Sequence, residues 1–499
     1  MTIRFALIII VAVFSLRLNP EFIPSVSFAG RVQSPPTSVN VASISFSGDN
    51  TVIRDRDALP YLGRWEDDNL DGTIDFSTGE RNDPICYDVD DQVQVSGVSL
   101  VVAPANSFNV SHGKVIGKVD GQDVFESANL STQTVGTTWY IIAVNFTTSL
   151  DGADTIALWA DKAITWRLEV QDPSVPGGPD VYPAGTSTHD FHFIAGLPPM
   201  FPQSQPSATP LKHTFIDLAC RGANGLLYDG TNAEAIADAI FAEFSDLEVV
   251  RAQDREEGVQ NSLALGYYRE WDTPVTHPRL LVEEGDGQCT SWARMFIACL
   301  HIAGVNPPNE EVKVDILPWA IYQRPRLFHV KNWTAPGTTT NPDPAWAGDW
   351  PYLNVFGVKF EEFFELSTNT YAFCNPDVLD VTGVPGQGGV IDPASLFSNH
   401  VIVHVGDRLY DPSYGKHYDT SGATGDDMVI AFESQVIWGY SLLFGEVEDP
   451  LGMVEELLLK CDVDHDGDID DDPEFAEGHL FILQANPNGN QLKVTETNR

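Results

Sequence analysis

Positively charged side chains are scarce in this sequence: its 499 residues include 28 Lys and Arg but 71 Asp and Glu, a formal net charge of −43. Proteins that bind a phosphate backbone or an anionic membrane surface need clustered cations. The composition therefore argues against nucleic acid and membrane partners. Such acidity instead favours solubility, salt tolerance or calcium binding.

Long apolar runs are equally rare. Residues 5–16 are mostly apolar and follow Arg4, but a bilayer-spanning helix needs about 20 such residues. This run and the small-x-small sequence Ser27-Phe28-Ala29 match a secretory signal peptide over residues 1–29. We predict a protein that is secreted, periplasmic or on the cell surface, with no membrane contact beyond export. An uncleaved anchor is the alternative.

Cysteine is infrequent, and phosphate-binding glycine motifs are absent. The sequence has no GxGxxG motif, no phosphate loop and no sustained repeat of solenoid length. Its six cysteines are Cys86, Cys220, Cys289, Cys299, Cys374 and Cys461. Six cysteines can pair evenly in an oxidising compartment, whereas one catalytic cysteine breaks that parity. In that case we expect Cys299 to be buried in a helix and the other four to form two disulfides or none.

Residues 285–304 place a cysteine where a glycine-rich turn becomes an amphipathic helix. Unpaired backbone N–H groups and the positive end of the helix dipole favour the reactive thiolate at such a position. Cys289 is therefore a candidate nucleophile, although cysteine is also often a buried core residue or half of a disulfide. We expect the helix to bury Trp292 and Phe296 and to end at Gly304.

Residues 399–405 alternate as a β-strand, with three valines on the core face and His400 and His404 on the other. Gly406-Asp407 predicts a two-residue hairpin turn. In that register Asp411 shares the histidine face and is a diagonal neighbour of both histidines, roughly 7 to 8 Å away. The register thus predicts an Asp–His pair but does not choose between the two histidines.

These motifs together resemble the bacterial transglutaminase-like superfamily, relatives of the papain-like cysteine hydrolases. The resemblance rests on a Gly-x-Gly-x-Cys turn that opens a helix, an Asn-His strand and a hairpin that ends in Tyr-Asp-Pro-Ser, and it covers roughly residues 206–445. It implies that Cys289 is the nucleophile and His400 the general base and acid. It also implies that Asp411 orients His400. The histidine strand departs from the family pattern, with His-Val-Ile in place of His-Ala-Trp.

The implied triad would act on amide bonds of protein or peptide substrates. The Cys289 thiolate attacks an acyl carbon, His400 protonates the leaving amine, and the thioester is resolved by water or by an amine. Water makes the protein a cysteine peptidase or amidase, and an amine makes it an acyl transferase. The Cys289 N–H is a natural oxyanion donor, and the sequence does not identify the second. A non-catalytic, calcium-stabilised surface or adhesion protein is the alternative function.

We expect a multidomain protein: a β-sandwich N-terminal module and an α+β transglutaminase-like (papain-like) domain. The alternating, valine- and threonine-rich segment 91–195 predicts an antiparallel β-sandwich. The expected division is a signal peptide (1–29), an acidic segment (30–90), the sandwich (91–195), a proline-rich linker (196–210), the transglutaminase-like domain (211–445) and a C-terminal segment (446–499).

One further helix is expected early in the transglutaminase-like domain. Thr231-Asn-Ala-Glu234 has the spacing of a capping box, in which the two outer side chains satisfy backbone N–H groups at the helix start. Ile236, Ile240 and Phe244 then recur at helical spacing. We expect the helix to run through about Phe244.

Two acidic loops match the first nine positions of an EF-hand calcium loop, in which oxygen ligands alternate and a glycine makes the turn. The expected ligands are Asp67, Asn69, Asp71, Thr73 and Asp75 in one loop and Asp462, Asp464, Asp466, Asp468 and Asp470 in the other. Neither loop has a glutamate at position 12, and Glu80 or Glu474 is the candidate replacement. We predict structural calcium at both loops. The alternative is a solvated acidic turn.

Overall fold

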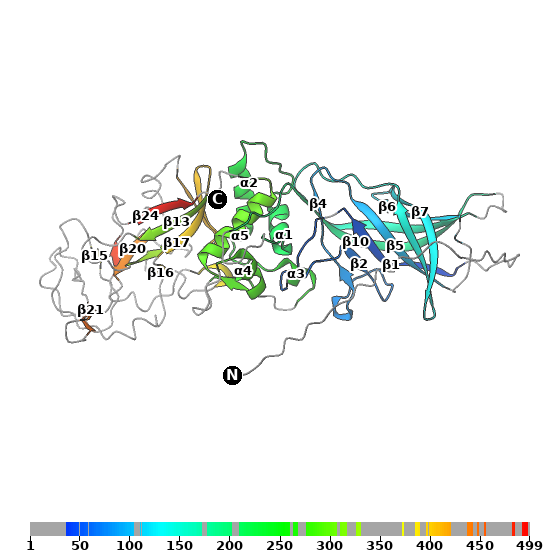
Figure 1. Ribbon diagram of the computed structural model, residues 1–499, viewed down its shortest axis with the longest axis horizontal. Coiled ribbons are helices and arrows are strands. Elements are labelled where there is room, and N and C mark those ends of the chain that lie inside the picture. Colours follow the sequence, from blue (N-terminus) through cyan, green and yellow to red (C-terminus); the bar gives the residue numbers. More distant parts are fainter. Residues whose placement is uncertain are drawn as a thin grey trace, which may run out of the picture.

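The computed structural model is rich in sheet, with one large curled sheet and a group of helices beside it (Figure 1). The structure describes residues 36–48, 50–57, 59–103, 110, 112–171, 177–201, 209–259, 263–267, 276–306, 385–389 and 399–420, together with the backbone of the further strands named below. The predicted signal peptide lies outside the described residues. No helix in these ranges is long and apolar enough to cross a membrane.

Ten strands form the large sheet, in the order β3-β2-β1-β5-β8-β7-β6-β9-β10-β4. They are β1 (Ser38–Ser47), β2 (Arg64–Glu66), β3 (Arg81–Asn82), β4 (Ile85–Asp88), β5 (Gln94–Ala103), β6 (Gly113–Val119), β7 (Gln122–Val135), β8 (Thr138–Phe146), β9 (Ala157–Val170) and β10 (Asp180–Ile194). The strands expected in 91–195 are present as β5 to β10. Strands β1 to β4, from before residue 91, join the same sheet.

The strands of 91–195 pair antiparallel with one another, as predicted, but the large sheet as a whole is mixed because β4, from before residue 91, joins it. Strand β4 runs parallel to β10, with Ile85 opposite Phe191, whereas β10 is antiparallel to β9. A parallel strand is favoured where both of its faces are covered. That condition holds here, because Ile85, Cys86 and Tyr87 are all buried.

The two ends of the large sheet meet across one core. Phe46 of β1 lies against His189 and Phe191 of β10, with ring centroids 4.9 and 5.4 Å apart. Trp65 and Trp166 are fully buried in the same core. Burying one such side chain contributes roughly 2 to 3 kcal/mol, so aromatic packing is a main source of the curl.

Five α-helices lie beside the large sheet. They are α1 (His213–Gly222), α2 (Ala233–Phe241), α3 (Ala252–Glu256), α4 (Pro278–Glu284) and α5 (Cys289–Ile302). Helix α5 is central, because it packs against α1, α2, α4 and strand β17 (Asn399–Val405) (Figure 1). Trp292 and Phe296 of α5 are fully buried, and the chain leaves the helix at Gly304 with a φ of +79°, as predicted.

Helix α2 confirms the predicted helix but not its capping box. It begins at Ala233, a short 3-10 helix η2 (Ala242–Phe244) extends it, and Ile236, Ile240 and Phe244 are buried as expected. The Thr231 hydroxyl instead donates to Asp229, 2.7 Å away. Glu234 accepts from the Asp407 N–H at 3.1 Å, so a distant hairpin turn takes the carboxylate that the capping box needed.

The remaining strands form four smaller sheets. One has the order β19-β18-β17-β13-β24 and another β15-β23-β20-β14-β16. Two are strand pairs, β11 with β12 and β21 with β22. The bounds are β11 (Gly266–Tyr267), β12 (Asp286–Gly287), β13 (Glu310–Ile316), β14 (Arg326–Val330), β15 (Ala372–Phe373), β16 (Leu396–Phe397), β18 (Arg408–Asp411), β19 (Lys416–Asp419), β20 (Ile437–Leu442), β21 (Val447–Glu448), β22 (Val454–Glu455), β23 (Ile482–Gln484) and β24 (Leu492–Thr497). Short 3-10 turns are η1 (Phe76–Thr78) and η4 (Gln387–Gly389).

Candidate active site

Two glycines shape the turn that leads into α5. Gly285 ends α4 with a φ of +99°, a left-handed conformation that glycine adopts without strain. A Cβ on Gly287 would lie 2.3 Å from the Ser291 hydroxyl oxygen, so no larger residue fits there without movement. The turn therefore depends on both glycines. It delivers Cys289 as the first residue of α5.

The start of α5 presents unpaired backbone donors. Gln288 is the N-cap residue, and its carbonyl accepts from the N–H groups of Ser291 and Trp292. The N–H groups of Cys289 and Thr290 donate to no other backbone group in the described part of the chain. Such first-turn N–H groups and the helix dipole stabilise negative charge. A negative charge on the Cys289 sulfur, or on an acyl oxygen bound next to it, would lie beside the positive end of the α5 dipole.

The predicted hairpin is confirmed by the strand register. Val405 pairs with Arg408, and Gly406 makes the turn with a φ of +62°. The valines of β17 are buried as expected, but His400 on the opposite face is also fully buried. His404, nearer the turn, is only half-buried. Both faces of β17 are thus covered where His400 lies.

Asp411 holds His400. The Nε2 atom of His400 and the Oδ2 atom of Asp411 are 2.7 Å apart, and both residues are fully buried. The other oxygen of Asp411 accepts from the Ser413 N–H at 3.1 Å, so the carboxylate is fixed from both sides. The structure thereby selects His400 over His404 as the partner of Asp411, a choice that strand register left open.

Cys289 interacts with the same imidazole. Because Asp411 takes Nε2 of His400, Nδ1 is the ring nitrogen that remains to face the thiol. Burial opposes the charged ring, but the Asp411 carboxylate and then a hydrogen bond with Cys289 raise the pKa of His400 to about 10. The carboxylate thus favours the charged form of the ring, and a charged imidazole is the neighbour that activates a nucleophilic cysteine. Cys289 is 8% exposed, so the sulfur is nearly but not wholly covered.

Two further side chains, Tyr414 and Gln387, contribute to this site and were not predicted from the sequence. The Tyr414 ring meets the His400 ring edge to face, with centroids 5.8 Å apart, and is itself buried. The Gln387 amide donates to the carbonyls of Pro412 and Phe244 at 2.8 and 2.7 Å, which anchors the turn after Asp411. Tyr414 directly follows the Tyr-Asp-Pro-Ser motif and was detectable from it. Gln387 is distant in sequence and was not.

The other described thiols have a different environment. Cys220, Cys289 and Cys299 are all free thiols rather than disulfides. Cys299 is buried in α5, as expected. Burial raises the pKa of Cys220 and of Cys299, so both are held as unreactive neutral thiols. Cys374 and Cys461 lie outside the described residues.

A second buried histidine resembles His400 in its pairing. His213, the first residue of α1, lies 2.9 Å from the Glu256 carboxylate, and its Nδ1 lies 3.3 Å from the Tyr61 hydroxyl. Burial lowers its pKa, but Glu256 and then Asp55 outweigh that effect and raise it to about 9. Tyr61 and the ring of His192 adjoin this imidazole.

The N-terminal acidic loop is folded as a compact turn. Asp67 accepts from the N–H groups of Leu70 and Gly72 at 2.7 Å each. Glu80 accepts from the N–H groups of Asn69 and Asp75, so its carboxylate spans the loop. Asp71 is bonded to Thr73 within the same turn.

Metal binding by either acidic loop stays a prediction. No group of three or more His, Cys, Asp or Glu side chains placed to hold a metal ion occurs among the described residues. That observation does not bear on calcium, because EF-hand-type loops also use amide, hydroxyl and backbone oxygens. The C-terminal loop, with Asp462, Asp464, Asp466, Asp468 and Asp470, lies outside the described residues.

Comparison with known proteins assigns no family. No protein-family model matches the sequence, and no curated protein sequence matches it. The functional argument therefore depends on the geometry around Cys289.

Proposed function

We propose that the protein is an exported, thiol-dependent acyl transferase or hydrolase that acts on amide bonds of protein or peptide substrates. The observation that carries the proposal is that one buried imidazole, His400, interacts with both the Cys289 thiol and the Asp411 carboxylate. A nucleophile, a base and a group that orients the base are the parts that covalent acyl transfer requires. The position of Cys289 at the first turn of a buried helix supports the same reading.

The proposed reaction has two steps. The Cys289 sulfur forms a bond to the acyl carbon while the amide C–N bond breaks, and His400 gives its proton to the leaving amine. Water or a second amine then attacks the thioester, and His400 takes its proton as the C–S bond breaks. The N–H groups at the start of α5 are oriented to stabilise the oxyanion that forms in each step.

The family proposal is a transglutaminase-like, papain-like α+β fold for the region that contains the site. It is supported by the order of elements, with a cysteine at a helix start followed by an antiparallel histidine hairpin. It is also supported by the packing of α5 on β17, which brings residues far apart in sequence to one place. The β-rich N-terminal region would then be a separate, non-catalytic module.

We also propose that the loop from Asp67 to Asp75 binds calcium in a structural role. Each carboxylate that accepts an N–H group keeps lone pairs free for a cation. Glu80 already reaches across the loop to Asn69 and Asp75, which suits the role of a closing ligand. No hydrogen bond or ion pair among the described residues joins this loop to Cys289, so calcium would stabilise the fold rather than take part in the reaction.

Product analysis tests the proposed activity. The full chain is incubated with a glutamine-containing peptide, with and without a primary amine, and products are identified by mass spectrometry. We expect deamidation or cleavage in water, or an amide adduct with the amine, and loss of every product in Cys289→Ala and His400→Ala. His404→Ala is the matched control and should retain activity. Peptide turnover that persists in Cys289→Ala, or none in the native chain with a range of peptides, would contradict the proposal in favour of a binding-only protein.

A further inference from the structure

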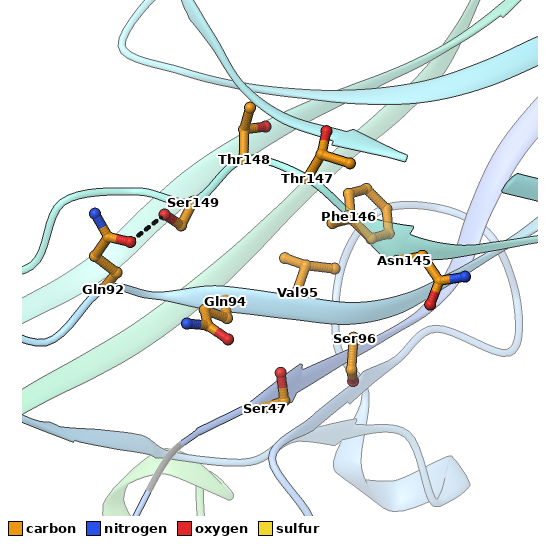
Figure 2. Close-up of a pocket in the computed structure, with 10 residues that line it drawn as sticks. All are labelled: Ser47, Gln92, Gln94, Val95, Ser96, Asn145, Phe146, Thr147, Thr148 and Ser149. Atoms are coloured by element: carbon orange, nitrogen blue, oxygen red, sulfur yellow. Dashed lines mark hydrogen bonds between the residues drawn. The ribbon is translucent and has the colours of Figure 1, made fainter. Parts of the chain in front are cut away.

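A hollow lies between β5 and β8 in the large sheet, beyond the last residues at which these two strands pair. The ladder ends at the pair Gly97 and Val144, and a single bridge between Val93 and Leu150 closes the other side. Between these points, residues 94–96 of β5 face the longer segment 145–149. The hollow has a volume of about 450 Å³, within the range of small-ligand pockets (Figure 2).

The opening is built into the backbone. Asn145 has a φ of +57°, the left-handed region that asparagine tolerates better than most residues. From this residue on, β8 no longer pairs with β5, whereas its pairing with β7 continues, with Val144 opposite Asn129 and Phe146 opposite Ser127. The hollow therefore lies where one ladder ends between two strands that each keep their other partner.

The lining is polar and uncharged. None of the residues around the hollow carries a charge, although one residue in five of the chain is charged. Most are Ser, Thr, Asn or Gln, and Val95 and Phe146 add apolar surface. An ionic ligand would find no counter-charge here, and a purely apolar ligand would leave the amides and hydroxyls without partners.

Four polar side chains at the hollow have unused hydrogen-bonding capacity. The side chains of Ser47, Gln94, Asn145 and Thr148 make no hydrogen bond with another described residue. They come from the end of β1, the start of β5, the end of β8 and the segment that follows β8 (Figure 2). Together they offer both donors and acceptors, the combination that sugar hydroxyl groups require.

Phe146 supplies an aromatic surface beside these groups. Its ring meets Trp166 edge to face at 6.3 Å, which fixes it, and the residue is only half-buried. Aromatic rings next to polar groups suit ligands with one apolar and one polar face, as in the C–H and hydroxyl faces of a sugar ring. A peptide fits less well, because β5 pairs with β1 and β8 pairs with β7 on the sides away from the hollow, and only the few residues beyond the end of the β5–β8 ladder offer an edge for strand addition.

We propose that this hollow is a binding site for a neutral carbohydrate. Gln94, Asn145 and Thr148 would bond its hydroxyls, and Phe146 would pack on a ring face. The site is separate from Cys289, which does not line it. It would therefore bind sugar whether or not the thiol is reactive, and it gives the β-rich region a recognition role of its own.

Calorimetry with a panel of neutral trisaccharides tests the proposal on the full chain. We expect saturable binding of at least one, weakened about tenfold or more in the double variant Gln94→Ala/Thr148→Ala. Thr132→Ala/Gln133→Ala, an equally polar and exposed pair on β7, is the matched control and should bind like the native chain. Cys289→Ala should also bind normally, so failure here and failure of the proposed reaction are distinguishable.

Four outcomes would overturn the assignment. The first three are no binding of any trisaccharide up to about 10 mM, binding that the Gln94→Ala/Thr148→Ala variant leaves intact, and tighter binding of an uncharged peptide such as a glycine-glutamine repeat. Loss of sugar binding in Cys289→Ala would also count against it, because it would move the sugar to the thiol site. Unchanged melting temperatures establish that the variants are folded.

Discussion

His400 and His213 are alike in burial and in pairing, but the group that each ring meets on its other side differs. Each ring is fully buried and lies within 2.9 Å of a carboxylate, Asp411 or Glu256. Each has a raised pKa, to about 10 and about 9. His400 meets Cys289 at the start of α5, whereas His213 meets the Tyr61 hydroxyl.

The comparison separates what a buried imidazole–carboxylate pair does for the fold from what it does for chemistry. The His400–Asp411 pair joins the two strands of one hairpin, the His213–Glu256 pair joins α1 to α3, and both bury an imidazole against a carboxylate. Neither property makes a catalyst. Catalysis also requires a nucleophile next to the imidazole. We therefore expect substitutions of His213 to affect stability and substitutions of His400 to affect the reactivity of Cys289.

The largest expected effect is on turnover. In the glutamine-peptide assay, His400→Ala should lower the rate by roughly 10³-fold or more, because the thiol loses its base and the leaving amine loses its acid. His213→Ala should stay within about threefold of the native rate per folded molecule. Equal losses in the two variants would erase the distinction between the pairs.

Next in size is the effect of neutralising each carboxylate. Asp411→Asn and Glu256→Gln should each lower the pKa of the paired histidine, because burial then acts unopposed on the charged ring. NMR titration of the histidine ring protons measures both shifts. Only Asp411→Asn should also lower turnover, by roughly 10² to 10⁴-fold. A fall in turnover with Glu256→Gln would mean that His213 shares in the reaction.

A smaller effect concerns stability against pH. A histidine whose folded pKa is raised stabilises the fold fully below its unfolded pKa of about 6.5, and that contribution is lost as pH rises through the folded value. For His213 the loss spans the interval from about 6.5 to about 9. His213→Gln should therefore be destabilised on the order of 2 kcal/mol at pH 6 and by much less at pH 10.

Urea unfolding at the two pH values makes that measurement. His112→Gln, at an exposed position, is the control and should follow the native chain at both. A His213→Gln deficit that is the same at pH 6 and pH 10 would show that the ring stabilises by packing rather than by charge.

The smallest expected effect comes from calcium. Chelation should lower the melting temperature by a few degrees through the Asp67–Asp75 loop, and Asp71→Ala should remove the difference. Thiol reactivity should be unaffected in both cases, because calcium at this loop is proposed to be structural. A loss of Cys289 reactivity on chelation would tie the loop to the site.

Local features of the site followed from the sequence. The glycine turn, the start of α5 at Cys289, the burial of Trp292 and the Gly406 hairpin all depend on residues close together in the chain, and each is present. The periodicity of a strand or helix gives its faces directly. These predictions needed no knowledge of what packs against each face.

Features that depend on distant partners did not follow. Register left His400 and His404 equal, and only the covering of β17 by α5 makes the His400 position the buried one. For the same reason, the sequence did not predict the His213–Glu256 pair or the parallel pairing of β4. It also gave Glu234 a helix-capping role that is wrong, because the Glu234 carboxylate accepts from the Asp407 N–H in the hairpin turn.

The most direct test is the alkylation rate of Cys289 by iodoacetamide at pH 6, followed by mass spectrometry of the modified peptide. The native chain should react at least about tenfold faster than a free cysteine, because the proposed triad places the His400 imidazole beside the thiol as its activating group. His400→Ala should fall to the free-thiol rate or below, and His213→Ala should match the native chain. A native rate no faster than free cysteine, or one that His400→Ala leaves unchanged, would contradict the account.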